Sequence, residues 1–422
     1  MPFSLPGVSA HKPRLRMFLV LALALMLGMH AWEFYSLRGE IRQGYPDFTA
    51  MYAAGRCVVS GLGSRLYDQQ VQSGIQQQFA SRVRNRLGPL PFTHPPFEAA
   101  LFAPLGLVAY TTAYWLWNAF SLLALFAFVY LLRPHLPALR NWSSAIPVLA
   151  SLAFFPVFVC LLQGQDSLLL LLLLGLAFVA MKGRRDFFAG ACLGLALFRF
   201  QLILPLLAIL LLRRKWKVLP GFALLAAALA GVSLAVVGWQ QTWNYPRTVL
   251  QLSRAQMSGA MNPTNMPNLR GVISSLAGEG NAAHLLIAVI SLALVGWAAW
   301  RWKSGTSDQD FDLSFSLAMV VAVMASYHLM AHDLSLLLLP LLLAADWLLR
   351  SGANGWMRRL MLPAMALLFF SPIYFLLWFR YQRFSVLFWV IALLAAGLSL
   401  ALRRSHGRQR ARAADGAGSI SN

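Results

Sequence analysis

Long apolar runs recur along almost the whole chain, and short polar or basic stretches separate each run from the next. A helix needs about 20 apolar residues to cross the hydrocarbon core of a bilayer, and most of these runs approach that length. The composition agrees, because 12% of the 422 residues are charged, whereas about 25% are charged in soluble proteins. A chain this apolar cannot bury its hydrophobic surface in one soluble core. The sequence therefore predicts an all-α, polytopic integral membrane protein.

We expect about 11–13 transmembrane helices. The stretch 95–132 is too long for one straight crossing and is interrupted by Pro104 and Gly106, so it predicts a short or re-entrant helix followed by a full one. The other expected spans are 17–35, 144–162, 167–181, 187–198, 202–212, 218–238, 282–300, 313–327, 334–349, 360–379 and 386–402. Together they form one membrane domain, 1–403. The polar, basic tail 404–422 is expected to be disordered.

Basic clusters between the spans predict the orientation, because cytoplasmic loops carry an excess of Lys and Arg. All these clusters fall on one side if the segments 187–198 and 202–212 run out and back, and both termini are then cytoplasmic. The net charge of +21 is compatible with nucleic-acid binding in principle. Here the basic residues lie mainly between apolar runs, so orientation and anionic lipids explain them, and no nucleic acid is expected.

The outer loop 36–94 carries several arginines, Arg56 among them, on the side where few are expected. Two explanations stay open. Long loops cross the membrane regardless of charge, or these arginines hold the phosphate of a lipid.

The stretch "GYPDFTAMYAAG" places Asp47, one of 14 acidic residues in the chain, directly after the first span. An Asp before an alanine-rich segment commonly caps a helix. The following segment predicts a small amphipathic helix on the outer leaflet. Asp47 would stand at the membrane-proximal start of that helix.

Further polar residues gather on the predicted outer side, at the ends of different helices, as in the cavities of membrane enzymes and transporters. Each has a structural explanation beside the functional one: a rigid turn at His94, caps at Gln163, Gln165 and Asp333, and snorkelling of Arg199 to an interface. In the functional interpretation Asp47 and His332 are the candidate reactive groups, and Arg199 and Arg56 are cations that can bind a phosphate. The substrate-binding candidates are His94, Gln163, Gln165, Gln201, Asn268 and Asp333.

No metal site is expected, since Cys57, Cys160 and Cys192 match no metal-binding spacing. The Asp-x-Asp pair at Asp310 and Asp312 lies at a predicted cytoplasmic helix start, where capping explains it better. No glycine-rich phosphate loop is present either. The sequence therefore predicts neither a bound nucleotide nor a metal cofactor.

Six motifs in order resemble glycosyltransferase family 87: "PDFTAMYAAGRCVVSGLGSRLYD", "THPPFEAALFAPLG", "QGQDSLLLLLLLGLAF", "AGACLGLALFRFQ", "MPNLRGVISSLAG" and "HLMAHDLSLLLLP". The likeness extends from about Tyr45 to Pro340. It implies a GT-C fold and a sugar donor linked to polyprenyl phosphate. The family's proposed catalytic base, the acid just after the first span, matches Asp47. Where members commonly show Lys-Pro, this chain has Arg199-Phe200, so the charge is kept and the proline is absent.

The residues fit this chemistry, since transfer from a polyprenyl phosphate needs a base for the acceptor hydroxyl and positive charge for the departing phosphate. The sequence thus predicts a membrane glycosyltransferase of the bacterial inner membrane. It would move a hexose, mannose first among them, or a pentose onto a glycolipid or envelope glycan at the outer face. The alternative is a transporter or flippase of lipid-linked glycans, although no internal repeat of the kind that transporters show is evident.

Overall fold

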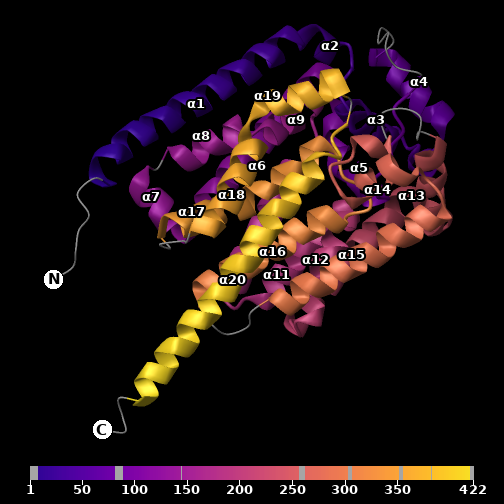
Figure 1. Ribbon diagram of the computed structural model, residues 1–422. Coiled ribbons are helices and arrows are strands. Elements are labelled where there is room, and N and C mark those ends of the chain that lie inside the picture. Colours follow the sequence, from indigo (N-terminus) through magenta and orange to yellow (C-terminus); the bar gives the residue numbers. More distant parts are fainter. Residues whose placement is uncertain are drawn as a thin grey trace.

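The computed structural model describes residues 8–80, 89–143, 145–255, 262–302, 307–350, 355–381 and 383–418. Parts of the predicted outer loop (81–88) and of the tail (419–422) lie outside these residues. The described chain is helical and contains no strand, which confirms the all-α fold (Figure 1). The α-helices are α1 (Val8–Ser36), α2 (Arg38–Arg42), α3 (Phe48–Val59), α4 (Gln69–Ala80), α5 (Pro96–Phe102), α6 (Tyr110–Leu132), α7 (Pro137–Trp142), α8 (Ile146–Ala153), α9 (Phe155–Gln163), α10 (Ser167–Lys182), α11 (Asp186–Leu195), α12 (Phe200–Leu212), α13 (Leu219–Ala255), α14 (Leu269–Ala277), α15 (Asn281–Arg301), α16 (Asp308–Ala325), α17 (Leu338–Arg350), α18 (Gly355–Phe369), α19 (Ser371–Leu376) and α20 (Leu387–Gly418).

Six described segments are long and apolar enough to cross a membrane, or up to eight if each of two bent helix pairs counts as one span. This confirms a multi-pass membrane protein. The bent pairs are α8 with α9, at 58°, and α18 with α19, at 64°. The count is below the predicted 11–13 for two reasons. The helix α10 and the apolar part of α20 are shorter than a full span, and α11 and α12 together count as one span, 186–212.

Contacts show that α11 and α12 do not form one straight helix. The backbone at Arg199, between them, is non-helical, with φ −117° and ψ 52°. Gly190 near the start of α11 lies against the Val218 carbonyl just before α13, and Gly221 lies against Phe187. Five residues separate the end of α12 at Leu212 from Val218, so these two positions are at most about 22 Å apart. The chain must therefore return along α12 to the end where α11 began, as the sequence predicted.

Helix ends sort into two groups at opposite ends of the bundle. One end holds the start of α3, the turn between α9 and α10, and Arg199. The other holds Lys182 of α10, which pairs with Asp312 at the start of α16, and Asp346 of α17, which accepts a hydrogen bond from the Leu139 backbone. The start of α1 and the C-terminal part of α20 also lie away from the first end (Figure 1). We call the first the outer end. That the opposite end is cytoplasmic stays a prediction.

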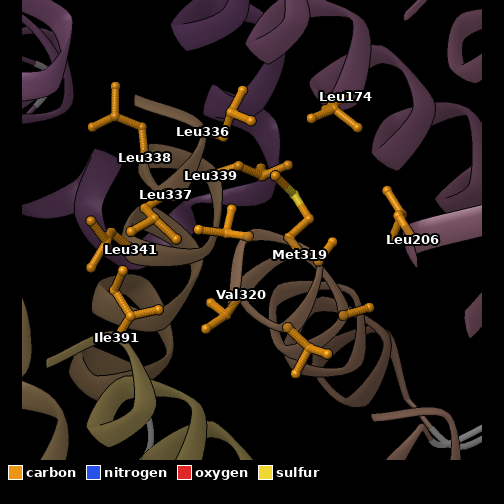
Figure 2. Packing of buried hydrophobic residues seen from close by; sticks show 14 of the residues in the cluster. Leu174, Leu206, Met319, Val320, Leu336, Leu337, Leu338, Leu339, Leu341 and Ile391 are labelled. Carbon is orange, nitrogen blue, oxygen red and sulfur yellow. The ribbon is translucent and has the colours of Figure 1, made fainter. Parts of the chain in front are cut away.

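The core lies between α10, α12, α16, α17 and α20, with a 3₁₀ helix (Ala331–Leu337) that leads into α17. α16 is buried along almost its whole length. Close-packed leucines with Met319 and Val320 fill the space between these helices (Figure 2). The labelled members are Leu174, Leu206, Met319, Val320, Leu336, Leu337, Leu338, Leu339, Leu341 and Ile391. This apolar packing fixes the helix ends that carry the polar residues described below.

The helix predicted after Asp47 forms as α3 at the outer end, but it does not lie exposed on the leaflet. Most of its residues are buried, including the run Ala53, Ala54 and Gly55. A Cβ atom on Gly55 would come within 2.3 Å of the Phe102 carbonyl of α5. The small residues therefore serve close packing against other helices. An amphipathic pattern alone does not tell a lipid surface from a protein surface.

Two further boundaries differ from the predictions. The span expected to end at Gly238 does break there, where φ is +79°, but helix resumes to Ala255. The tail expected to be disordered continues α20 as helix to Gly418. Alanine and arginine are the commonest residues of the stretch 404–418, with four of each, and both have high helix propensity.

Candidate functional site

Polar side chains from five segments meet at the outer end of the bundle. They come from the start of α3, the loop before α5, the turn between α9 and α10, the break between α11 and α12, and the 3₁₀ helix before α17. The cluster, called the outer cluster below, consists of Asp47, His94, Glu98, Gln163, Gln165, Asp166, Ser167, Arg199, His332 and Asp333. Charged groups buried at membrane depth are costly unless they pair or serve a ligand.

Asp47 occupies the N-cap position of α3, yet its side chain makes no capping hydrogen bond. Its carboxylate Oδ2 instead accepts a hydrogen bond from Gln165 Nε2, at 2.9 Å. Its backbone N–H donates to Gln163 Oε1, at 3.0 Å. The side chain is half-buried. Gln165 thus holds the carboxylate and Gln163 holds the backbone of the same residue, while part of the side chain stays accessible.

Gln165 links Asp47 to Arg199, because its Oε1 accepts a hydrogen bond from Arg199 Nη2, at 2.6 Å. Arg199 is 5% exposed, so it does not snorkel to the surface. Its Nε and Nη2 donate to Asp166 Oδ1, at 2.8 and 2.5 Å, and its Nη1 lies 4.0 Å from Asp333. The predicted phosphate-binding cation is therefore already paired with acidic side chains.

Asp166 also faces His94 and Glu98. His94 Nδ1 lies 2.7 Å from Glu98 Oε2 and 3.8 Å from Asp166 Oδ2. Burial, with the nearby Asp166 carboxylate, raises the pKa of Glu98 well above its usual value. Burial, with Arg199, lowers the pKa of His94 to about 4. Burial alone would raise the pKa of Asp166, but Arg199 beside it outweighs that effect and lowers the pKa. Glu98 is then neutral and Asp166 ionised at acidic pH.

Asp333 is the fully buried acid of the outer cluster beside His332. Its Oδ1 accepts from Ser167 Oγ, at 2.9 Å, and its Oδ2 accepts from the Met330 backbone N–H, also at 2.9 Å. His332 Nε2 lies 3.6 Å from Asp333 Oδ1 and has no hydrogen-bond partner among the described residues. Asp333 is therefore held on both oxygens, and His332 keeps a free ring nitrogen.

Local sequence explains why these segments converge. Gly164 ends α9 with φ +62°, and a Cβ there would lie 2.8 Å from Phe48 Cβ, so glycine allows both the turn and the approach of α3. Pro95 and Pro96 start α5 next to His94, with proline at the first helical position. The helix break at Arg199 forms although phenylalanine, and not proline, follows it.

Three predicted site residues lie elsewhere or have other partners. Arg56 is nine residues along α3 from Asp47, about 13 Å along a helix axis, and its Nη2 lies 3.5 Å from Gln78 Oε1. Asn268 uses both ends of its amide, accepting from Gly271 N and donating to the Ser326 carbonyl, to cap α14. Gln201 lies half-buried in the first turn of α12. Substrate contacts of these residues stay predictions.

Three members of the outer cluster were not predicted as site residues: Glu98, Asp166 and Ser167. A usable signal was present, since Glu98 follows His94 by four residues and Asp166 follows Gln165 directly, in a chain poor in acids. At the other end, Asp312 of the Asp-x-Asp pair accepts from Lys182 Nζ, at 2.6 Å. Ser307 Oγ caps α16 by accepting from the Asp310 backbone.

The arrangement offers an accessible carboxylate and a buried guanidinium that are joined through Gln165, and a free imidazole nitrogen beside Asp333. A carboxylate in such a position can take a proton from a hydroxyl. A guanidinium can stabilise developing negative charge if part of it is available to a ligand.

Comparison with known proteins gives one family match and several relatives. The profile of glycosyltransferase family 87 matches residues 92–326, more than half of the chain. A polyprenol-phosphate-mannose-dependent alpha-(1-2)-phosphatidylinositol pentamannoside mannosyltransferase from Mycolicibacterium smegmatis is 26% identical over 309 residues, 72% of this chain and 70% of that protein. An alpha-(1->3)-arabinofuranosyltransferase from Corynebacterium glutamicum is 26% identical over 242 residues, 56% of this chain and 52% of that protein. No solved structure matches.

The family match includes His94, Gln165 and Arg199, whereas Asp47 precedes it and His332 follows it. Family membership therefore supports enzymatic sugar transfer, does not favour a transporter, and leaves the roles of individual residues as predictions. On the extent of the match, the chain belongs to glycosyltransferase family 87 and is a membrane glycosyltransferase.

Proposed function

We propose that the protein transfers a sugar, mannose in the first instance, from a polyprenyl-phosphate donor to a glycolipid or envelope glycan at the outer face of the bacterial inner membrane. One named relative supports the donor class, since it depends on polyprenol-phosphate-mannose, and the other is named for the transfer of arabinofuranose. The names differ in sugar, so a pentose is the second candidate. The basic clusters at the end opposite the outer cluster support cytoplasmic termini.

Asp47 is the proposed catalytic base, and the observation that carries this is its hydrogen bonding. The residue stands at the start of α3 without capping it, and Gln165 and Gln163 hold it instead. A carboxylate that is positioned yet half-exposed can meet an acceptor hydroxyl. As the acceptor oxygen attacks the sugar C1, Asp47 takes the hydroxyl proton, and the C1–oxygen bond to the lipid phosphate breaks. One carboxylate is enough for such an inverting displacement.

Arg199 and His332 are the proposed partners for the donor. Arg199 Nη1 has Asp333 as its nearest acid, at 4.0 Å, which is longer than a hydrogen bond. That edge is the part of the guanidinium proposed to stabilise the departing phosphate. His332 Nε2, which has no hydrogen-bond partner among the described residues, is proposed to bind the phosphate or the acceptor. No nucleotide is proposed to take part.

Purified protein in nanodiscs tests the function directly. Radiolabelled polyprenyl-phosphate mannose and polyprenyl-phosphate arabinose are supplied separately with membrane glycolipid extract, and label in the acceptor is measured. We expect transfer from one donor, and transfer by the Asp47→Asn protein that is slower by about 10²-fold or more. Movement of the donor between leaflets without transfer would identify a flippase and refute the proposal.

A further inference from the structure

The outer cluster contains more buried acid than cation. Four carboxylates surround His94: those of Asp47, Asp166 and Asp333 lie within electrostatic reach of its imidazole, and that of Glu98 lies 2.7 Å from its Nδ1. Among the described residues, Arg199 is the one Lys or Arg that forms ion pairs with them. A charge buried without compensation is expensive. A negatively charged donor phosphate would also be repelled by this surplus, so the cluster needs further positive charge or protons.

Three groups of the cluster converge on one point. His94 Nδ1, a Glu98 oxygen and an Asp166 oxygen all lie within 4.8 Å of one another. Ligands around a tetrahedral ion with bonds of about 2.1 Å are about 3.4 Å apart, and the two measured separations from His94, 2.7 and 3.8 Å, lie on either side of that value. Small side-chain shifts would bring all three into a coordination sphere.

Orphaned oxygens point to a missing partner at the same place. Asp166 has a fully buried side chain, and its Oδ2 has no hydrogen-bond donor among the described residues. Glu98 Oε1 also has no hydrogen-bond donor among the described residues. These two carboxyls can satisfy each other if Glu98 keeps a proton, so a proton is the rival to a metal ion. Asp166 Oδ1 stays bound to Arg199 in either case.

The loop that carries His94 is held firmly by its backbone, as a metal ligand requires. Tyr67 Oη donates to the His94 carbonyl, at 2.8 Å, and Tyr245 Oη donates to the Thr93 carbonyl, at 3.2 Å. Phe92 stacks on the imidazole, with ring centroids 5.5 Å apart.

We propose that His94, Glu98 and Asp166 bind one divalent transition-metal ion, Zn²⁺ or Mn²⁺, as a third feature of the site beside Asp47 and Arg199. Imidazole with two carboxylates suits these ions better than Mg²⁺ or Ca²⁺, which prefer oxygen ligands. Three protein ligands leave a coordination position open. That position takes an oxygen of the donor phosphate, a role that rests on the proposed function. The inference departs from the expectation, drawn from the sequence, of no metal.

Calorimetry with Zn²⁺ or Mn²⁺ alone tests the site, on untagged full-length protein that has been stripped with chelator. The wild type should bind one ion, and Glu98→Gln and Asp166→Asn should bind at least tenfold more weakly. Asp310→Asn, which alters the buried acid at the opposite end, is the matched control and should bind like the wild type. Titration in two buffers of different ionisation enthalpy should show proton release in the wild type, because the ion replaces the Glu98 proton.

Absence of stoichiometric binding by the wild type, or unchanged binding by a folded Glu98→Gln protein, would overturn the site. Circular dichroism and thermal unfolding establish folding, and Glu98→Gln decides if Asp166→Asn does not fold. Farnesyl phosphate added to the Mn²⁺-loaded protein should change the Mn²⁺ paramagnetic resonance spectrum. An unchanged spectrum with farnesyl phosphate bound would refute the phosphate role. Neither measurement needs turnover, so failure of the proposed function would be recognised separately.

Discussion

Replacement of Arg199 by methionine should show how much the Arg199–Asp166 ion pair contributes to the free energy of unfolding. The guanidinium is 5% exposed and donates twice to Asp166, which is fully buried. Removal of one partner of a buried pair leaves the other charge uncompensated and costs about 3–5 kcal/mol. Arg199→Met and Asp166→Asn should therefore each lower the free energy of unfolding by about that amount.

The double variant Arg199→Met/Asp166→Asn should lose less than about 2 kcal/mol, because both charges are gone and the site can pack as neutral groups. Unfolding in mixed micelles, followed by tryptophan fluorescence with chelator present, measures each value. Arg65→Met is the matched control, because it breaks the ion pair of Arg65 with Asp68, in which the Arg65 side chain is 54% exposed. It should lower the free energy of unfolding by less than about 1 kcal/mol. Losses that simply add in the double variant would refute the pairing.

Three further outcomes follow from the geometry. Gly55→Ala should destabilise the protein by about 1–3 kcal/mol, whereas Gly74→Ala, where a Cβ meets nothing within 4 Å, should be neutral or stabilising in the same unfolding assay. Gln165→Ala should lower turnover by about 10²-fold because the candidate base loses its donor, and unchanged turnover would show that this amide does not position it. The raised pKa of Glu98 means that its contribution to stability is complete below about pH 4.5 and is lost as pH rises through the raised value. Thermal unfolding of the metal-free protein should show this loss, and Glu98→Gln should remove it.

Much of the architecture could be predicted because membrane helices appear in the sequence as long apolar runs with basic residues between them. Apolar length and basic clusters predicted the helical class and the return of the chain at Arg199. The surface that each helix faces could not be predicted in this way. The sequence of α3 is amphipathic, and the burial of most of its residues, with the contact of Gly55 with Phe102, shows that protein and not lipid covers it.

The outer cluster was predicted in part, because polar residues at helix ends on one side of a membrane tend to meet. Gln163 and Gln165 both hydrogen-bond to Asp47 in the structure, and their expected contact with substrate stays a prediction. The pairing of Arg199 with Asp166 could not be predicted, since it depends on how α10 and α12 pack. Arg56 is a different case: its nine-residue distance from Asp47 on a helix already indicated that the two side chains lie apart.

Turnover and thermal stability of one purified Asp47→Asn protein test the catalytic assignment most directly. Asparagine keeps the size of the side chain, and its Oδ1 can still accept the hydrogen bond from Gln165 Nε2. No capping bond is lost, because the Asp47 side chain makes none. If Asp47 is the base, the variant should unfold at the wild-type temperature and transfer sugar about 10²–10⁴-fold more slowly. Near-normal transfer by the folded variant would contradict that role.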